Sequence, residues 1–158
     1  MKNLGELRYF LGLKVIRMTE GIWLSQRQYA LDMLSKYGMV DCKPIIMPLD
    51  ANTKLSTHDG DVLEDLTMYC KIVGSLIYLT IMRPYLSYTV RLQSQFMQLP
   101  WKPHLDAVRR TLRYVRATLD HALFYDADVL VELHGYTKAD WVGSATDRRS
   151  TSGFMFTL

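Results

Sequence analysis

Hydrophobic and polar positions in the first part of the chain follow the alternating pattern of β-strands. Residues 8–18 read RYFLGLKVIRM and are rich in aromatic and β-branched side chains. The sequence TEG then provides a turn, and residues 22–26 (IWLSQ) resume the extended pattern. Two extended runs separated by a short turn that contains glycine are typical of a β-hairpin. We therefore predict a hairpin over residues 8–26.

A helical period follows directly after this hairpin. Ser25 and Gln28 have the spacing of a capping box, in which each side chain satisfies a backbone group at the start of a helix. Apolar residues then recur at helical spacing until Gly38. Glycine commonly ends a helix because it adopts positive φ without strain. The pattern predicts a helix over residues 26–37.

Residues 39–67 show little periodicity and include two prolines. A connection of this length either wraps a domain or marks a boundary, and we expect it to be ordered in part and to wrap the core. Helical periodicity returns over residues 67–82, with Gly74 as an expected point of close packing. Pro84 then stops this helix, because the residue before a proline avoids helical geometry.

Two more helices are predicted between residues 84 and 119. The first begins at Pro84, which suits the first turn of a helix, and its apolar face carries Tyr88, Leu92 and Phe96. The second covers residues 103–118. Its apolar residues form a single stripe, which is typical of a helix that buries one face against a core. The stripe consists of Leu105, Val108, Leu112, Val115 and Leu119.

After Asp120 the pattern changes to period two and predicts strands again. The alternating runs are ALFY, VLVELHGYT and GFMFTL, with a glycine-marked turn region before the last one. The predicted fold class is therefore α+β, with an N-terminal β-hairpin and helix, a central helical bundle, and an incomplete C-terminal antiparallel sheet. Because the last run stops within its pattern, we expect a bare strand edge that invites self-association.

Composition narrows the class of protein. A chain of 158 residues, 49% of them hydrophobic, has the size and composition of one globular domain. A net charge of +3 permits a nucleic-acid partner without requiring one. Cys42 and Cys70 have no metal-ligand spacing with His or Cys, so a reducing intracellular compartment, cytoplasmic or nuclear, fits best. No membrane span or export signal is expected, since the apolar run at residues 72–82 is far shorter than the roughly 20 residues of a span.

The polar face of the predicted helix at residues 103–118 carries a basic row. Arg109, Arg113 and Arg116 stand at positions i, i+4 and i+7 and share one face, with Arg110 further around. Such a row can contact a phosphate backbone and release its counterions. The alternative is a solvated basic face whose arginines pair with acids of the long connection at residues 39–67. The sequence leaves both interpretations open.

The stretch GYTKADWVGS, residues 135–144, has a carboxylate at one of two positions where a metal site would need both. In a strand, the side chains of Lys138 and Asp140 point to the same face. Two carboxylates so placed could share divalent ions about 4 Å apart, as two-metal phosphodiester chemistry requires. Here the first position holds an ammonium group, which repels Mg²⁺. The pair is therefore a poor metal site, and we expect no metal or other cofactor on this chain.

Eight segments, taken in order, resemble one family. The resemblance is to the Pol polyprotein of copia-type long-terminal-repeat retrotransposons, and it covers nearly the whole chain. The segments are LGELRYFLGLKV, GIWLSQRQYALDML, KPIIMPLD, YCKIVGSLIYLTIMRP, SQFMQLP, LRYVRATLDHALFY, GYTKADWVGS and DRRSTSGF.

This resemblance implies a position within the polyprotein. The matching region begins just after the catalytic hairpin of the polymerase and ends inside the first strands of ribonuclease H. The chain contains no YxDD-type sequence, which in the family holds the polymerase metals. Residues 1–66 would be the hairpin, helix and wrapping segment that follow the palm. Residues 67–120 would be thumb and connection helices, and residues 121–158 would be truncated ribonuclease H strands.

The resemblance also implies roles for single residues. Tyr9, Phe10, Leu11 and Gly12 resemble the primer-contacting segment, and the basic row would lie near a template–primer duplex or an RNA/DNA hybrid. The family usually reads SDADWAG where this chain reads TKADWVG. Lys138 would therefore replace a metal-binding carboxylate, and Asp140 would be a remnant of the nuclease site.

We thus expect a Pol fragment that is catalytically inactive by itself, from a parent that carries out RNA-directed DNA synthesis with Mg²⁺. Three further departures agree with this expectation. They are Tyr85, Leu105 and Ala117, which stand where the family usually has the aspartate of RPD, the tryptophan of HW and a glycine. The alternatives are a nucleic-acid-binding module that has lost its chemistry and an interaction fragment that docks on other Pol segments.

Overall fold

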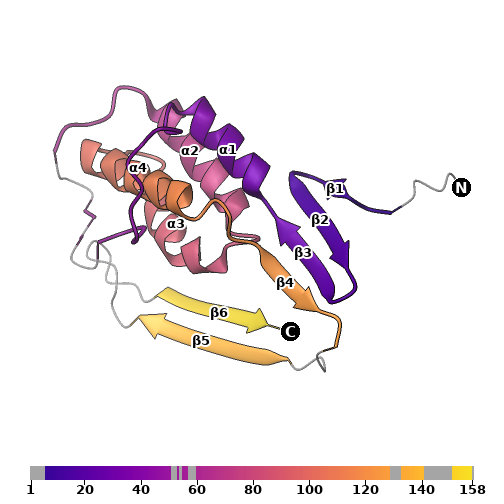
Figure 1. The fold of residues 1–158 in the computed structure, drawn as a ribbon. Helices are drawn as coiled ribbons and strands as arrows, with labels where there is room; N and C mark the ends of the chain where they lie inside the picture. The colour runs from indigo at the N-terminus through magenta and orange to yellow at the C-terminus, as the bar shows by residue number, and fades with distance from the viewer. Residues whose placement is uncertain are drawn as a thin grey trace, which may run out of the picture.

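The structure is a computed structural model that describes residues 6–50, 53, 55–56, 60–128, 133–140 and 151–157. The predicted α+β fold class is confirmed, and Figure 1 shows the helices gathered beside the N-terminal strands and β4. None of the described helices is long and apolar enough to cross a membrane. The strands are β1 (Tyr9–Phe10), β2 (Leu13–Met18), β3 (Gly21–Ser25), β4 (Leu123–Asp126), β5 (His134–Asp140) and β6 (Thr151–Thr157). The helices are α1 (Arg27–Lys36), α2 (Leu66–Leu79), α3 (Ser87–Ser94) and α4 (Lys102–Ala117), with a 3₁₀ turn, η1 (Pro84–Leu86), before α3.

The predicted N-terminal hairpin is confirmed, and it forms part of a four-stranded antiparallel sheet in the order β1-β2-β3-β4. Phe10 pairs with Leu13, so only Leu11 and Gly12 connect β1 to β2. Both connecting residues have positive φ, at 47° and 79°, as in the two-residue turns whose twist matches hairpin strands. Leucine rarely adopts positive φ. The tip of this hairpin is therefore a strained point of the backbone.

The partner of β4 differs from the prediction of one C-terminal sheet over residues 121–158. In the structure β4 pairs with β3, while β5 and β6 pair with each other in a separate sheet. The chain leaves α4 beside the start of α1, where Arg27 donates to Asp120 at 2.8 Å, and β4 then continues along β3. Gly21 allows the close pairing, because a Cβ there would collide with the backbone oxygen of Tyr125. A period-two pattern predicts a strand but not its partner.

The predicted first helix is confirmed as α1. The glycine predicted to end it does so, whereas the capping box predicted at its start does not form. Gly38 has a φ of 64°, and with Met39 it donates backbone hydrogen bonds to the last turn of α1, as a glycine-ended helix requires. The predicted capping box is wrong. The Ser25 hydroxyl accepts from the Arg27 N–H at 3.2 Å, while the Gln28 side chain bonds along the helix instead of back to its start.

The core lies between α1, α2 and α4. Every residue of the predicted apolar stripe of α4 is buried, which confirms that prediction. Gly74 on α2 is exposed, and a Cβ added there would meet nothing within 4 Å. The prediction that Gly74 is a point of close packing is therefore wrong. The same core cluster includes Leu34 on α1, Ile72, Val73, Leu76 and Leu79 on α2, Leu86 in η1 and Val90 on α3.

The buried face of α3 differs in part from the prediction. Phe96 is buried and the half-buried Leu92 packs in the same cluster, as predicted. Tyr88, the first residue of the predicted apolar face, is 58% exposed, whereas Val90 and Gln93 are buried. One reason is η1, since a 3₁₀ turn has three residues per turn instead of 3.6 and changes which residues face inward. The other reason is that a polar residue lies inside. The Gln93 amide donates to the Ala107 carbonyl at 3.1 Å and to the Thr111 hydroxyl at 2.7 Å.

Residues 39–56, which we call the strap, lie along α4 as far as the structure describes them. The Thr111 hydroxyl on α4 donates to the Pro48 carbonyl at 3.3 Å. Beyond the strap, Val62 forms an antiparallel bridge with Trp101, directly before α4. The prediction that this long connection is ordered in part and wraps the core is confirmed for its described residues.

Candidate nucleic-acid interface

The start of α4, the helix that carries the basic row, is fixed by a buried histidine. The Trp101 N–H donates to His104 Nδ1 at 3.0 Å, so Nδ1 is an acceptor. His104 Nε2 then carries the proton and donates to the Ser56 carbonyl at 2.9 Å. His104 is fully buried and stacks on Phe96 with ring centroids 3.9 Å apart. A neutral histidine thus joins the first turn of α4 to the strap.

Two arginines of the basic row hold the strap through one nitrogen each. Arg113 Nε donates to the Lys43 carbonyl and Arg116 Nε to the Val40 carbonyl, both at 2.7 Å. A guanidinium has five N–H donors in one plane. Within the described residues, the terminal nitrogens of these two groups make no further hydrogen bond. Each side chain is therefore fixed in direction while its terminal donors stay available to an anion.

Arg109 and Arg110 are placed differently. Arg109 Nη1 lies 3.8 Å from Asp106 Oδ1, and these side chains are 54% and 60% exposed, so the pair contributes little to stability. Arg110 is half-buried, and its Nε is buried without a hydrogen-bond partner among the residues that the structure describes. The alternative prediction was pairing with acids of the loop at residues 39–67. The described contacts of Arg113 and Arg116 with that loop run to backbone carbonyls instead.

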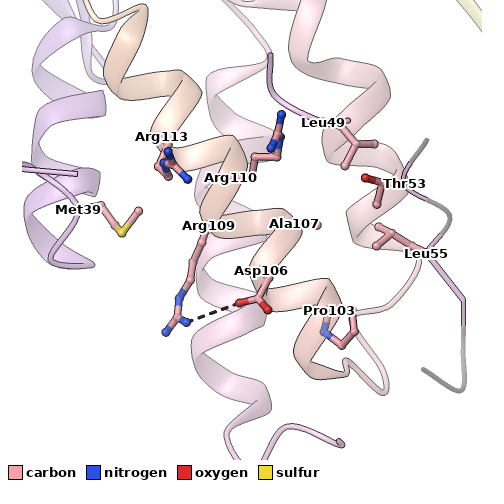
Figure 2. A pocket seen from close by; sticks show the side chains of 10 residues that line it. All are labelled: Met39, Leu49, Thr53, Leu55, Pro103, Asp106, Ala107, Arg109, Arg110 and Arg113. Carbon is pink, nitrogen blue, oxygen red and sulfur yellow. Dashed lines mark ion pairs between the residues drawn. The ribbon is translucent and has the colours of Figure 1, made fainter. Parts of the chain in front are cut away.

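A pocket of about 670 Å³ lies between α4 and the strap. Figure 2 shows Asp106 and three arginines along α4, with the strap residue Met39 on one side of the helix and the strap residues Leu49 and Leu55 on the other. The pocket therefore combines charged groups with apolar walls. Its lining residues are Met39, Leu49, Thr53, Leu55, Pro103, Asp106, Ala107, Arg109, Arg110 and Arg113.

The predicted primer-contacting residues form the exposed tip of the first hairpin. Tyr9, Phe10 and Leu11 are 56%, 54% and 69% exposed. The Tyr78 hydroxyl donates to the Leu11 carbonyl, and the Tyr78 ring packs edge-on against Tyr29 with centroids 4.8 Å apart. α2 therefore anchors the strained turn. In Figure 1, α1 lies between this tip and α4, so the tip and the basic row are separate surfaces.

The two residues of the predicted metal position both lie in β5. Lys138 pairs with Gly153 and Asp140 with Thr151 across the hairpin, which confirms the predicted strand. The side chains of Lys138 and Asp140, and residues 141–150, lie outside the described part of the chain. Within the part that is described, no three His, Cys, Asp or Glu side chains gather as a metal site. The assignment of these two residues stays a prediction.

Arg83 positions the other end of α4, and the sequence analysis missed it. Its side chain is 1% exposed and donates to the Thr118 hydroxyl at 2.8 Å and to the Leu119 carbonyl at 3.4 Å. Burial lowers the pKa of the guanidinium, and nearby Tyr85 raises it in part. Among the described residues no carboxylate pairs with Arg83, but the C-terminus of a helix stabilises a cation. The sequence signal was an arginine placed directly after an apolar run and before Pro84. We interpreted this Arg-Pro pair as a helix stop and as part of the family resemblance, and not as a buried cation.

Comparison with known proteins gives a consistent set of relatives. The chain is 42% identical over all of its 158 residues to the retrovirus-related Pol polyprotein from transposon RE2 of Arabidopsis thaliana, and 43% identical to the one from transposon RE1 of the same plant. It is 36% identical over 169 aligned positions to the Pol polyprotein from transposon TNT 1-94 of Nicotiana tabacum. The chain spans 11% to 12% of the length of these relatives. No family model matches it, and no solved structure matches it.

Proposed function

The chain belongs to the retrovirus-related Pol polyproteins of copia-type transposons, and we propose that its part in such a polyprotein is to hold nucleic acid. It would be the C-terminal part of the reverse transcriptase, running into ribonuclease H. The basic row of α4 would contact the phosphate backbone of a duplex or an RNA/DNA hybrid. RNA-directed DNA synthesis with Mg²⁺ would be the activity of the whole polyprotein, of which this chain spans about a tenth.

One observation carries this proposal: two of the three arginines of the row are held in place before any ligand binds. Arg113 and Arg116 are each fixed by a 2.7 Å bond from Nε to the strap, and Arg109 lies one turn before Arg113 on the same helix. A fixed guanidinium loses less conformational freedom when it binds a phosphate. Each neutralised phosphate also releases counterions, at about −0.9 in the slope of log K against log salt. Three contacts on a duplex therefore predict a slope of about −2.7.

Salt-dependent binding tests the proposal. Fluorescence anisotropy with a labelled DNA duplex and an RNA/DNA hybrid, between about 50 and 200 mM salt, should give this slope with little sequence preference. Changing Arg109, Arg113 and Arg116 together to Gln should weaken binding and flatten the slope. The matched control removes three exposed positive charges elsewhere, with the substitutions Arg17→Gln, Lys36→Gln and Lys71→Gln. A triple Gln variant of α4 that binds as the unmodified chain does would overturn the proposal.

A second pair of substitutions separates charge from the holding of the strap. Arg113→Lys with Arg116→Lys keeps both positive charges but lacks the Nε–H of arginine. We expect faster amide exchange at residues 40–43 in this variant, because the strap carbonyls lose their partners, with the salt slope largely kept. If the Lys variant instead loses as much affinity as the Gln variant, binding depends on an ordered strap and not on the charges of the row.

The family implies bound Mg²⁺ for catalysis, and the donor set of β5 does not fit it. Lys138 stands two positions before Asp140 in this strand, so an ammonium group occupies a position where a second carboxylate is needed to gather metal ions. The proposal therefore includes that the chain by itself neither extends a primer nor cleaves a hybrid. Purified chain with Mg²⁺ or Mn²⁺ should turn over neither substrate above background. Hybrid cleavage that Asp140→Ala abolishes would contradict this.

A further inference from the structure

The pocket between α4 and the strap has the size and chemistry of a ligand site. Its volume of about 670 Å³ lies within the roughly 300–1,000 Å³ of small-molecule pockets. Three arginines and one aspartate line it, so its formal charge favours an anion. Leu49, Leu55 and Ala107 supply an apolar wall. A free inorganic anion would leave that wall and most of the volume without a contact.

Arg110 marks where an acidic group would bind. The side chain is half-buried and lines the pocket. Its Nε is enclosed by protein atoms and has no hydrogen-bond partner among the described residues, so the terminal nitrogens are the donors that a ligand in the pocket would use. Figure 2 shows the Arg110 side chain on the strap side of α4. Arg113 lines the same pocket, and among the described residues only its Nε donates to the strap. Both guanidinium groups therefore line the pocket, where each can donate to an acidic group of a ligand.

We propose that this pocket takes one unpaired nucleotide of a nucleic-acid strand, with its phosphate on Arg110 and Arg113 and its base against Leu49 and Leu55. This inference rests on the proposed function, which places a nucleic acid along α4, and it adds a binding site for a single-stranded or displaced nucleotide beside the duplex. The phosphate and base are common to RNA and DNA. The experiment below distinguishes an RNA strand from a DNA strand.

Calorimetric titration of the full chain with mononucleotides tests the site. Adenosine 5′-monophosphate and its 2′-deoxy form are compared with adenosine and with inorganic phosphate. We expect at least one nucleotide to bind about tenfold or more tightly than either adenosine or phosphate alone, because only the nucleotide contacts both the arginines and the apolar wall. The ribo and deoxy forms show which strand the pocket accepts. Phosphate binding as tightly as both nucleotides would overturn the inference, as would the absence of nucleotide binding.

Two variants locate the binding within the pocket. Arg110→Gln removes a guanidinium that the proposal places on the phosphate, and Thr53→Glu places a carboxylate on the strap wall, at a residue outside α4. Each should weaken nucleotide binding by about tenfold or more, whereas Lys71→Gln, which removes an exposed charge on α2, should leave it unchanged. Nucleotide binding that survives both pocket variants would overturn the inference.

The outcome is distinguishable from that of the duplex experiment. Duplex binding that depends on Arg109, Arg113 and Arg116, without any mononucleotide binding, would support the proposed function and refute the nucleotide site in the pocket. Mononucleotide binding that Thr53→Glu abolishes, without any duplex binding, would support the nucleotide site in the pocket and refute the proposed function.

Discussion

Arg83 is a buried cation whose counter-charge is the end of a helix. Its donors reach Thr118 and Leu119 at the C-terminus of α4, so Arg83→Ala would leave buried acceptors without partners and create a cavity. We expect a loss of about 2–4 kcal/mol in the free energy of unfolding, measured by urea denaturation. Lys71→Ala, an exposed control on α2, should change it by less than about 0.5 kcal/mol. An Arg83→Ala loss as small as the control's would contradict this role.

The buried Tyr69 makes the free energy of unfolding depend on pH in the alkaline range. It is fully buried and its hydroxyl donates to the Gln93 carbonyl at 2.7 Å, and burial raises its pKa above the ordinary value of 10.0. Above about pH 10 the folded chain therefore keeps a proton that the unfolded chain loses, so stability falls as pH rises. Tyr69→Phe should lose about 1 kcal/mol at neutral pH but decline less steeply above pH 10. Tyr29 and Tyr114, whose pKa values burial also raises, keep part of the decline. Parallel pH profiles of the two proteins would refute the assignment to Tyr69.

At the scale of elements, the sequence predicted what depends on local pattern. The stripe of α4 was predictable because its period repeats over 16 residues. The face of α3 was predictable only in part, since 8 residues hold few periods and the buried Gln93 interrupts the apolar pattern. The partner of β4 was also not predictable, because it depends on the position in space at which the chain leaves α4. Within the candidate site, spacing predicted that the arginines share a face. It could not predict the bond from Arg113 to Lys43, because contacts between residues 70 apart leave no local pattern.

The pairing of β4 with β3 depends on Gly21, and glycine substitutions test it. Gly21→Ala would drive a Cβ into the backbone oxygen of Tyr125 at a φ of 153°, so we expect a loss of about 1–3 kcal/mol and faster amide exchange in β4. Gly38→Ala is the matched control, because its φ is also positive at 64° but nothing lies within 4 Å of the added Cβ. It should cost only about 1 kcal/mol and leave β4 protected. Unchanged exchange in β4 of Gly21→Ala would contradict the pairing.

At the scale of the whole molecule, exposed apolar groups gather on the N-terminal sheet. β1 and β4 are the two edges of this sheet, and β1 consists of the half-exposed Tyr9 and Phe10. On β3 and β4, Trp23 and Phe124 contact each other with ring centroids 4.6 Å apart and are still 37% and 40% exposed. Open strand edges beside apolar surface promote association.

We therefore expect the purified chain to self-associate through the N-terminal sheet. Its mass by size-exclusion chromatography with light scattering should rise with protein concentration, and a hydrophobic dye should bind it. Phe10→Glu places a charge on edge strand β1 and should shift the chain toward the monomer, because charged edge residues oppose pairing. Tyr88→Glu changes an aromatic residue of similar exposure, 58%, that lies on α3 away from the sheet, and it should not shift the mass. A monomer at every concentration, or equal effects of the two variants, would remove the sheet as the site of association.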